Sequence, residues 1–311
     1  MNAMRTELLA AAGSIGQMER YIEAGATAVL IGEPRFAMRL PGAIPQEAIA
    51  DAIAKAHRAG AKAYVSMNKL FRNHELPALP GYLKLLAEAE ADAVVFGDPA
   101  VLLNVREHAP GLPLHWNAEM TGTNSATAGY WGRRGATRAV LARELNEEEI
   151  ADLKSKTTMQ VQVQAHGMTN IYFSQRNLLQ SYMDHLGKEA RIVEQGPNDG
   201  RYLVEAERPE EKLPIYEDEN GTHVMSADDI ALLEVLPELL RAQVDSLYIE
   251  TLLKPEAYNE AVIRLYRQAM EAWERDPDGY ECDEEWLDAL HAQQPEGREL
   301  GFGFLYKEQV Y

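Results

Sequence analysis

Cysteine is almost absent from this 311-residue chain, which contains only Cys282. A single thiol can neither form an internal disulfide nor supply an all-cysteine metal site. Long hydrophobic runs are also missing, since none approaches the roughly 20 residues of a membrane span. The first residues show no basic region followed by an apolar segment, so no signal peptide is predicted. These absences predict a protein of a reducing compartment, the cytoplasm, that does not enter a membrane.

Basic residues are scarce relative to acidic ones. The chain has 30 Lys and Arg against 49 Asp and Glu, which gives a net charge of −19. Because Lys and Arg that neutralise phosphates dominate affinity for nucleic acids, the chain is predicted to bind them poorly by itself. Acidic blocks such as 205–211 and 281–285 are most simply a solvated surface. Any role on RNA would need a basic partner or a local basic patch.

Several catalytic motifs are missing as well. The chain contains no His-x-x-x-His or His-Glu-x-x-His zinc spacing and no Gly-x-Ser-x-Gly nucleophile turn. No recognisable protease motif therefore supports a hydrolytic function. The segment Ala10–Ser14, at the end of the first predicted strand, does not match the glycine-rich phosphate-binding turn of a dinucleotide-binding sheet.

What the sequence does contain is a weak internal repeat, in which a helix end is followed by a short, nearly all-apolar segment. Glycine at a helix end accepts the left-handed conformation that closes many helices. A continuous apolar run is typical of a strand covered on both faces, as in parallel sheets. The copies lie at 24–32 (AGATAVLIG), 59–66, 89–97 (AEADAVVFG), 134–142 and 242–250.

Eight strands that alternate with eight helices predict an α/β fold, a TIM-like (βα)8 barrel, with an open doubly wound sheet as the alternative. The predicted strands are Glu7–Ala10, Ala28–Ile31, Ala63–Met67, Ala93–Phe96, Leu112–Trp116, Ala139–Ala142, Gln160–Ala165 and Ser246–Glu250. The predicted helices are Ile15–Ala24, Gln46–Ala59, Gly81–Ala89, Val101–His108, Ser125–Arg134, Glu147–Lys154, Asp228–Ala242 and Glu256–Trp273.

One insertion interrupts this pattern. The barrel is predicted to occupy residues 1–275, with a mixed insertion at about 167–222 after the seventh strand, on the C-terminal face where barrel active sites lie. Turn residues and the alternating segment RYLVEAE, which begins at Arg201, predict a small β-hairpin there. Residues 276–311 are predicted to form a short acidic tail whose aromatic end, 301–306, docks on the barrel.

Polar residues at the ends of the predicted strands are the candidates for a site. Five of the eight are carboxylates, which could hold a divalent cation or act as an acid and a base. Each one alone could equally pair with a nearby basic side chain or cap the next helix, whereas the set at one mouth predicts a functional pocket. The His166 imidazole would point either at this mouth or at the helical layer. The eight candidates are Glu33, Asn68, Asp98, Glu119, Arg143, Glu144, His166 and Glu250.

Several segments taken together carry a family resemblance. ELLAAAGS at Glu7–Ser14, LAREL at Leu141–Leu145, the stretch His166–Gln180 and DSLYIE at Asp245–Glu250 are similar to the corresponding motifs of the collagenase-like peptidase family U32. The resemblance covers nearly the whole chain. The retained motif residues are His166, Gly167, Ser174, Arg176, Leu178, Leu179, Asp229, Lys254 and Tyr258.

The resemblance also shows what this chain lacks. Family members thought to act as hydroxylases carry four cysteines that bind an iron–sulfur cluster. Two of these positions are Asn170 and Asn177 here, and Gly200 stands where another cysteine would precede an arginine. Because thiolates are the normal ligands of such clusters, no iron–sulfur cofactor is expected in this chain. It resembles the shorter, cysteine-poor members of the family that occur beside a longer, cluster-bearing member.

The resemblance implies a role beside such a partner. The chain would be a subunit of a heteromer with the cluster-bearing U32 paralogue, and the complex would hydroxylate the wobble uridine of tRNA to 5-hydroxyuridine in an oxygen-independent, prephenate-linked reaction. The tRNA would be contacted through the complex. Whether the chain is itself catalytic stays open, and a peptidase, a binding scaffold and a homodimer remain alternatives. The implied catalytic residues are Arg143, Glu144, His166 and Glu250, and the implied substrate-binding residues are Asn68, Asp98, Glu119 and Arg176, with no metal ligand assigned.

Overall fold

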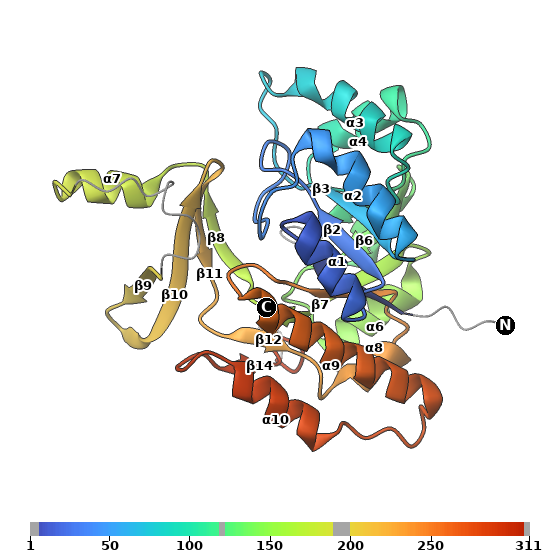
Figure 1. The fold of residues 1–311 in the computed structure, drawn as a ribbon, viewed down its shortest axis with the longest axis vertical. Coiled ribbons are helices and arrows are strands. Elements are labelled where there is room, and N and C mark those ends of the chain that lie inside the picture. The colour runs from blue at the N-terminus through green and yellow to red at the C-terminus, as the bar shows by residue number, and fades with distance from the viewer. Residues whose placement is uncertain (1–5, 118–121, 189–199, 308–311) are drawn as a thin grey trace.

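The computed structural model describes residues 6–117, 122–188 and 200–307. Eight parallel strands form a closed barrel, as predicted, because β13 pairs with both β1 and β7 (Figure 1). The barrel strands are β1 (Glu7–Ala11), β2 (Ala28–Ile31), β3 (Lys62–Met67), β4 (Ala93–Phe96), β5 (Leu114–Asn117), β6 (Ala136–Val140), β7 (Gln160–Gly167) and β13 (Ser246–Ile249).

Helices alternate with the strands and cover the outside of the barrel (Figure 1). They begin where the sequence offers caps: the Ser14 hydroxyl accepts the backbone N–H of Gln17, and Asn146 and Glu149 form a complete capping box. No helix in the described ranges is long and apolar enough to span a membrane. The helices between strands are α1 (Ile15–Glu23), α2 (Gln46–Arg58), α3 (Leu79–Glu88, preceded by the 3-10 turn Leu76–Ala78), α4 (Pro99–His108), α5 (Ser125–Gly132), α6 (Glu147–Lys156), α8 (Leu236–Arg241) and α9 (Glu256–Arg275).

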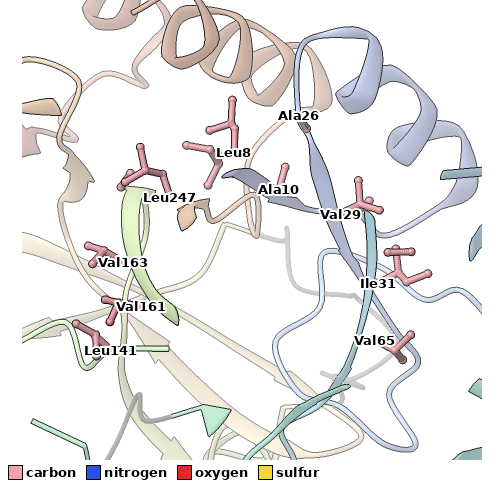
Figure 2. Close-up of a cluster of buried hydrophobic side chains, with 14 of the residues drawn as sticks. Leu8, Ala10, Ala26, Val29, Ile31, Val65, Leu141, Val161, Val163 and Leu247 are labelled. Carbon is pink, nitrogen blue, oxygen red and sulfur yellow. The ribbon is translucent and has the colours of Figure 1, made fainter. Parts of the chain in front are cut away.

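The main hydrophobic core lies between the barrel and its helices. Figure 2 shows Leu8, Val29 and Val163 on the outer faces of their strands, pointing away from the barrel axis. Because successive side chains of a strand point to opposite faces, the residues between them point into the barrel. Leu9 and Tyr64, for example, belong to a separate, smaller buried cluster inside it. The continuous apolar runs of the sequence therefore divide between two buried faces, as in other parallel sheets.

The insertion is larger than the predicted hairpin. It forms a four-stranded antiparallel sheet in the order β8-β11-β10-β9, with one helix, and we call it the arm. The arm stands out from one side of the barrel (Figure 1). Its elements are β8 (Asn170–Ser174), α7 (Leu178–His185), β9 (Tyr202–Glu205), β10 (Arg208–Asp218) and β11 (Gly221–Met225).

Contacts at the end of the arm join it to loops at the barrel mouth. Asn220, between β10 and β11, donates from Nδ2 to the carbonyl oxygen of Ala37 at 3.2 Å. Arg72, after β3, donates from Nη2 to Oε1 of Gln175 at 2.6 Å. The arm is therefore held beside the C-terminal ends of the barrel strands.

The predicted helix at 228–242 is wrong in its first half. Residues Asp229–Ala231 form strand β12, which pairs antiparallel with the end of β7, and the helix α8 is limited to Leu236–Arg241. The chain after α9 supplies the reason, because β14 (Leu300–Gly301) pairs with β12 and α10 (Glu284–Gln293) packs against α9. These partners are distant in sequence, so local propensity could not reveal them.

Candidate functional site at the barrel mouth

The inward faces of the strands carry a polar lining at their C-terminal ends. There the side chains and the loop between β2 and α2 surround a cavity of about 60 Å³, which we call the mouth cavity. Active sites of such barrels lie at this face. The polar residues around it are Arg39, Ser66, Asn68, Asn117, Arg143, Gln162, Gln164, Tyr248 and Glu250.

Two predicted catalytic residues line the mouth cavity together. Arg143, in the turn after β6, donates from Nη2 to the carbonyl oxygen of Asn170 at 3.2 Å. Glu250 follows β13 directly; its Oε2 accepts from the Tyr248 hydroxyl at 3.2 Å and its Oε1 from the Leu252 backbone N–H at 3.0 Å. A guanidinium and a carboxylate thus line one small cavity, and hydrogen bonds hold each in place.

Asn68, a predicted substrate-binding residue, also lines the mouth cavity. Its Oδ1 accepts the backbone N–H of Met38 at 2.8 Å, and its Nδ2 donates to the carbonyl oxygen of Met38 at 3.3 Å. The amide therefore holds the loop between β2 and α2 against the end of β3. In this structure Asn68 shapes the wall of the cavity through that loop.

The glutamines of β7 are site residues that the sequence analysis missed. Gln164 donates from Nε2 to the carbonyl oxygens of Gly167 and Met168, at 3.2 and 2.9 Å, and so shapes the turn that leaves the barrel. Gln162 is 3% exposed, and its Oε1 has no hydrogen-bond partner among the described residues. A buried amide oxygen without a partner costs about 1–3 kcal/mol, so a ligand that donates a hydrogen bond would be favoured here. The alternation of Val and Gln along 161–164 was the available signal.

His166 is not brought to the mouth cavity. It is fully buried on the outer face of β7, where its Nε2 lies 2.8 Å from the Tyr258 hydroxyl and its ring packs beside Tyr266 of α9. Burial lowers the pKa of His166 to about 4, so the imidazole is neutral at pH 7. Of the two directions that the sequence left open, the structure shows the helical layer. This position does not suit the predicted catalytic role.

The backbone conformation at residue 167 explains why a glycine follows His166. Its φ of +100° lies in the region that favours glycine, and a Cβ there would meet the carbonyl oxygen of Glu250 at 2.3 Å. The close approach lets β7 leave the barrel directly beside Glu250. The His166-Gly167 pair is therefore a packing feature of this strand end.

Two of the predicted mouth carboxylates bind helix N-termini instead. Asp98 caps α4 through Oδ1, which accepts the N–H of Ala100 at 2.8 Å, and its Oδ2 accepts the N–H of Phe71 at 2.9 Å. Glu33 accepts the N–H of Gln46, the first residue of α2, at 3.0 Å. For these residues the structure favours the capping interpretation, and Asp98 does not line the mouth cavity.

The remaining predicted residues lie outside the mouth cavity or outside the described chain. Glu144 is exposed in the turn after β6 and does not line the cavity. Arg176 is exposed on the arm between β8 and α7, where its carbonyl oxygen accepts from the Thr222 hydroxyl at 2.7 Å. Glu119 lies outside the described residues. In the ranges that the structure describes, no three His, Cys, Asp or Glu side chains come together as metal ligands.

A second buried polar cluster joins β12 to the tail and α9. Asp229 is 1% exposed; its Oδ1 accepts from Arg298 at 2.6 and 2.9 Å, and its Oδ2 accepts from Lys254. Burial by itself raises the pKa of Asp229, but the hydrogen bond with Arg298 and the charge of Lys254 outweigh it and hold this pKa below its ordinary value. Asp229, Lys254 and Tyr258 were motif residues in the sequence, and this cluster gives them a structural role.

A model of Peptidase family U32 matches residues 13–310 of the chain. The chain is 43% identical over 308 residues to tRNA hydroxylation protein P2 of Bacillus subtilis (strain 168), covering 99% of each sequence. It is 29% identical over 287 residues to tRNA hydroxylation protein P1 of the same organism, covering 92% of this chain and 68% of that protein. The solved structure of the U32 peptidase Mk0906 superposes with a TM-score of 0.51 at 15% identity, covering 80% of this chain and 94% of that one.

Proposed function

Since the chain belongs to peptidase family U32, we propose that it takes part in the hydroxylation of tRNA. The observation that carries the proposal is the 43% identity with tRNA hydroxylation protein P2 along 99% of both sequences. Similarity of this extent includes the barrel, the arm and the tail, and not only a shared scaffold. The wobble uridine is the target we propose, in an oxygen-independent reaction linked to prephenate.

We propose that a partner protein carries out the redox step of the reaction. The residues of this chain do not fit an iron–sulfur cluster: Asn170 donates from Nδ2 to the carbonyl oxygens of Tyr172 and Val224, at 3.0 and 3.3 Å, and Asn177 is exposed before α7. The single thiol, Cys282, is half-buried and points at the carbonyl oxygen of Leu233. Amides and one thiol do not replace four thiolates. A longer, cluster-bearing relative in the same cell would supply the electron transfer.

The mouth cavity would then bind part of the substrate base. Uracil presents carbonyl acceptors and one N–H donor, and the side chains of Gln162, Asn117, Arg143 and Glu250 offer complementary groups. A cavity of about 60 Å³ has room for the edge of a ring but not for a nucleoside. The mouth cavity would therefore contact one edge of the base.

Deletion of the gene in the native host, followed by nucleoside analysis of bulk tRNA, tests this function. We expect the hydroxylated uridine to disappear and to return when the wild-type gene is restored. Restoration with Arg143→Ala should fail or give roughly a hundredfold less hydroxylated uridine, as when one polar contact to a reacting centre is removed. Glu144→Ala is the matched control, because this neighbouring side chain is exposed outside the cavity.

Unchanged tRNA hydroxylation after deletion would contradict the proposed function. Equal loss of activity in Arg143→Ala and Glu144→Ala, with both proteins folded, would instead contradict the assignment of the mouth cavity.

A further inference from the structure

Helix α7 of the arm projects from the molecule (Figure 1), and its apolar side chains are exposed. Leu178 and Tyr182 within it, and Leu186 at its end, follow at intervals of four residues and so share one face. Their side chains are 40, 58 and 45% exposed, and no residue of this helix is buried. The helix is amphipathic, and among the residues that the structure describes none buries its apolar side.

The start of α7 is nevertheless firmly held. Glu217 is 1% exposed and accepts the backbone N–H groups of Leu179 and Gln180, at 2.6 and 3.2 Å. The Thr222 hydroxyl oxygen accepts the N–H of Leu178 at 2.9 Å. These bonds satisfy the free N–H groups of the first turn and set the direction of the helix. An isolated helix shorter than about 12–15 residues is marginal in water, so covering its apolar face would stabilise it.

The rest of the arm carries more exposed apolar surface. Among the described residues, eight of the fourteen large hydrophobic side chains that are exposed lie on the arm. Tyr202, Leu203 and Val204 of the edge strand β9 are about half exposed, and an open edge of this kind invites pairing.

The charge of the arm indicates which kind of partner would bind this apolar surface. The β9–β10 hairpin bears the acidic residues Glu205, Glu207, Glu210 and Glu211, and its Arg208 pairs with Glu205 and Glu211. A second copy would bring the same acidic hairpin and another net charge of −19. Nucleic acid would be repelled in the same way. A protein with apolar surface and a basic rim is favoured by both burial and charge.

We propose that α7 and β9 form the docking face for a different protein, one that presents an apolar groove bordered by Lys and Arg. The proposal rests on the proposed function, in which a longer, cluster-bearing relative supplies the electron transfer. Asn220 and Gln175 tie the arm to loops at the barrel mouth, and Gln175 directly precedes the turn that leads into α7. The start of α7 is therefore held on the side of the barrel that carries the mouth cavity.

The test uses the full chain and the cluster-bearing U32 relative of the same host, both purified, with affinity measured by titration calorimetry. The variant Leu178→Ser/Tyr182→Ser/Leu186→Ser should bind roughly tenfold more weakly or worse, since truncated interface anchors commonly cost more than 1 kcal/mol each. Leu103→Ser on α4 is the matched control, because Leu103 is 60% exposed and lies away from the arm. All three side chains of the variant are exposed, so its melting temperature should match that of the wild type.

Three results would overturn the docking proposal. One is equal affinity of the triple variant and the wild type, or no binding of the relative by either. The second is a wild-type homodimer in light scattering that the triple variant converts to a monomer, which would make a second copy the occupant. The third is loss of tRNA affinity by the variant without the partner. Nucleoside analysis of the deletion strain separates this failure from that of the proposed function, since the function stands if the hydroxylated uridine disappears.

Discussion

A single irregularity in β7 decides which residues reach the mouth cavity. Gln162 and Gln164 point inward, opposite Ser246 and Tyr248 of β13, and strict alternation would point His166 inward as well. The register shifts at this point, so that Ile249 pairs with His166 and Ala165 is an extra residue. A β-bulge re-aims the side chain that follows it. The imidazole is therefore buried against α9, and β7 presents the amides of Gln162 and Gln164 to the cavity.

The buried imidazole makes stability depend on pH. With a pKa of about 4 in the folded state and 6.5 as the ordinary value, His166 stays neutral while the unfolded chain takes up a proton below pH 6.5. Its contribution is present above pH 6.5 and is lost as the pH falls toward 4, by roughly 3 kcal/mol in total. His115 contributes with the same sign, since burial holds its pKa well below 6.5 too.

Denaturant unfolding between pH 7 and 4.5 measures this effect. We expect His166→Gln to reduce the loss of unfolding free energy across that interval, and His166→Gln/His115→Gln to reduce it further. The exposed His74→Gln serves as the control. An identical slope in wild type and double variant would contradict the role of buried histidines.

At the level of elements, β12 shows how distant partners override local preference. Residues 228–242 have a helical pattern, yet Asp229 lies between Lys254 and Arg298 and the strand pairs with both β7 and β14. A buried carboxylate is tolerated because it is paired and hydrogen-bonded. The ion pairs thereby join the tail to the barrel.

Removing the carboxylate should release the tail. For Asp229→Ala we expect Arg298 and Lys254 to lose their shared partner, with a destabilisation of about 3–5 kcal/mol. Hydrogen exchange should accelerate first at the amides of β12 and β14. Glu299→Ala, an exposed neighbour, should leave the exchange rates unchanged. Faster exchange confined to other strands would contradict the proposed linkage.

On the scale of the whole molecule, a buried ion pair crosses the N-terminal end of the barrel. Arg138 of β6 donates from Nη1 to Oε1 of Glu7 of β1 at 2.6 Å, and the Tyr64 hydroxyl donates to Oε2 of Glu7 at 2.6 Å. Arg138 is 1% exposed. Burial by itself raises the pKa of Glu7, but the charge of Arg138 and the hydrogen bonds outweigh it and hold this pKa below 4.5. The N-terminal end of the barrel is thus closed by a buried ion pair that contributes to stability, whereas the C-terminal end carries the mouth cavity.

Acid should weaken this cross-barrel pair. Because the pKa of Glu7 is lowered on folding, its contribution is present above pH 4.5 and is lost as the pH falls through the folded-state value. Arg138→Met leaves the carboxylate buried without its partner and should destabilise the protein at pH 7 by about 3–5 kcal/mol. The exposed Arg208→Ala is the control and should unfold at the wild-type denaturant concentration. Equal midpoints for both variants would contradict the importance of the pair.

The sequence by itself determined the barrel, because apolar runs at regular intervals between amphipathic helices allow few other folds. It also determined the lack of iron–sulfur ligands, since composition alone excludes four thiolates. Arg143, Glu250 and Asn68 could be placed at the mouth from strand ends, but Asp98 and Glu33 could not be told from helix caps. The alternation of Val and Gln along 161–164 also encoded the inward glutamines, although the prediction did not use it. The direction of the His166 side chain, strand β12 and the size of the arm were decided only by the tertiary structure. Each depends on a bulge or on a pairing partner far along the chain, and no local pattern encodes either.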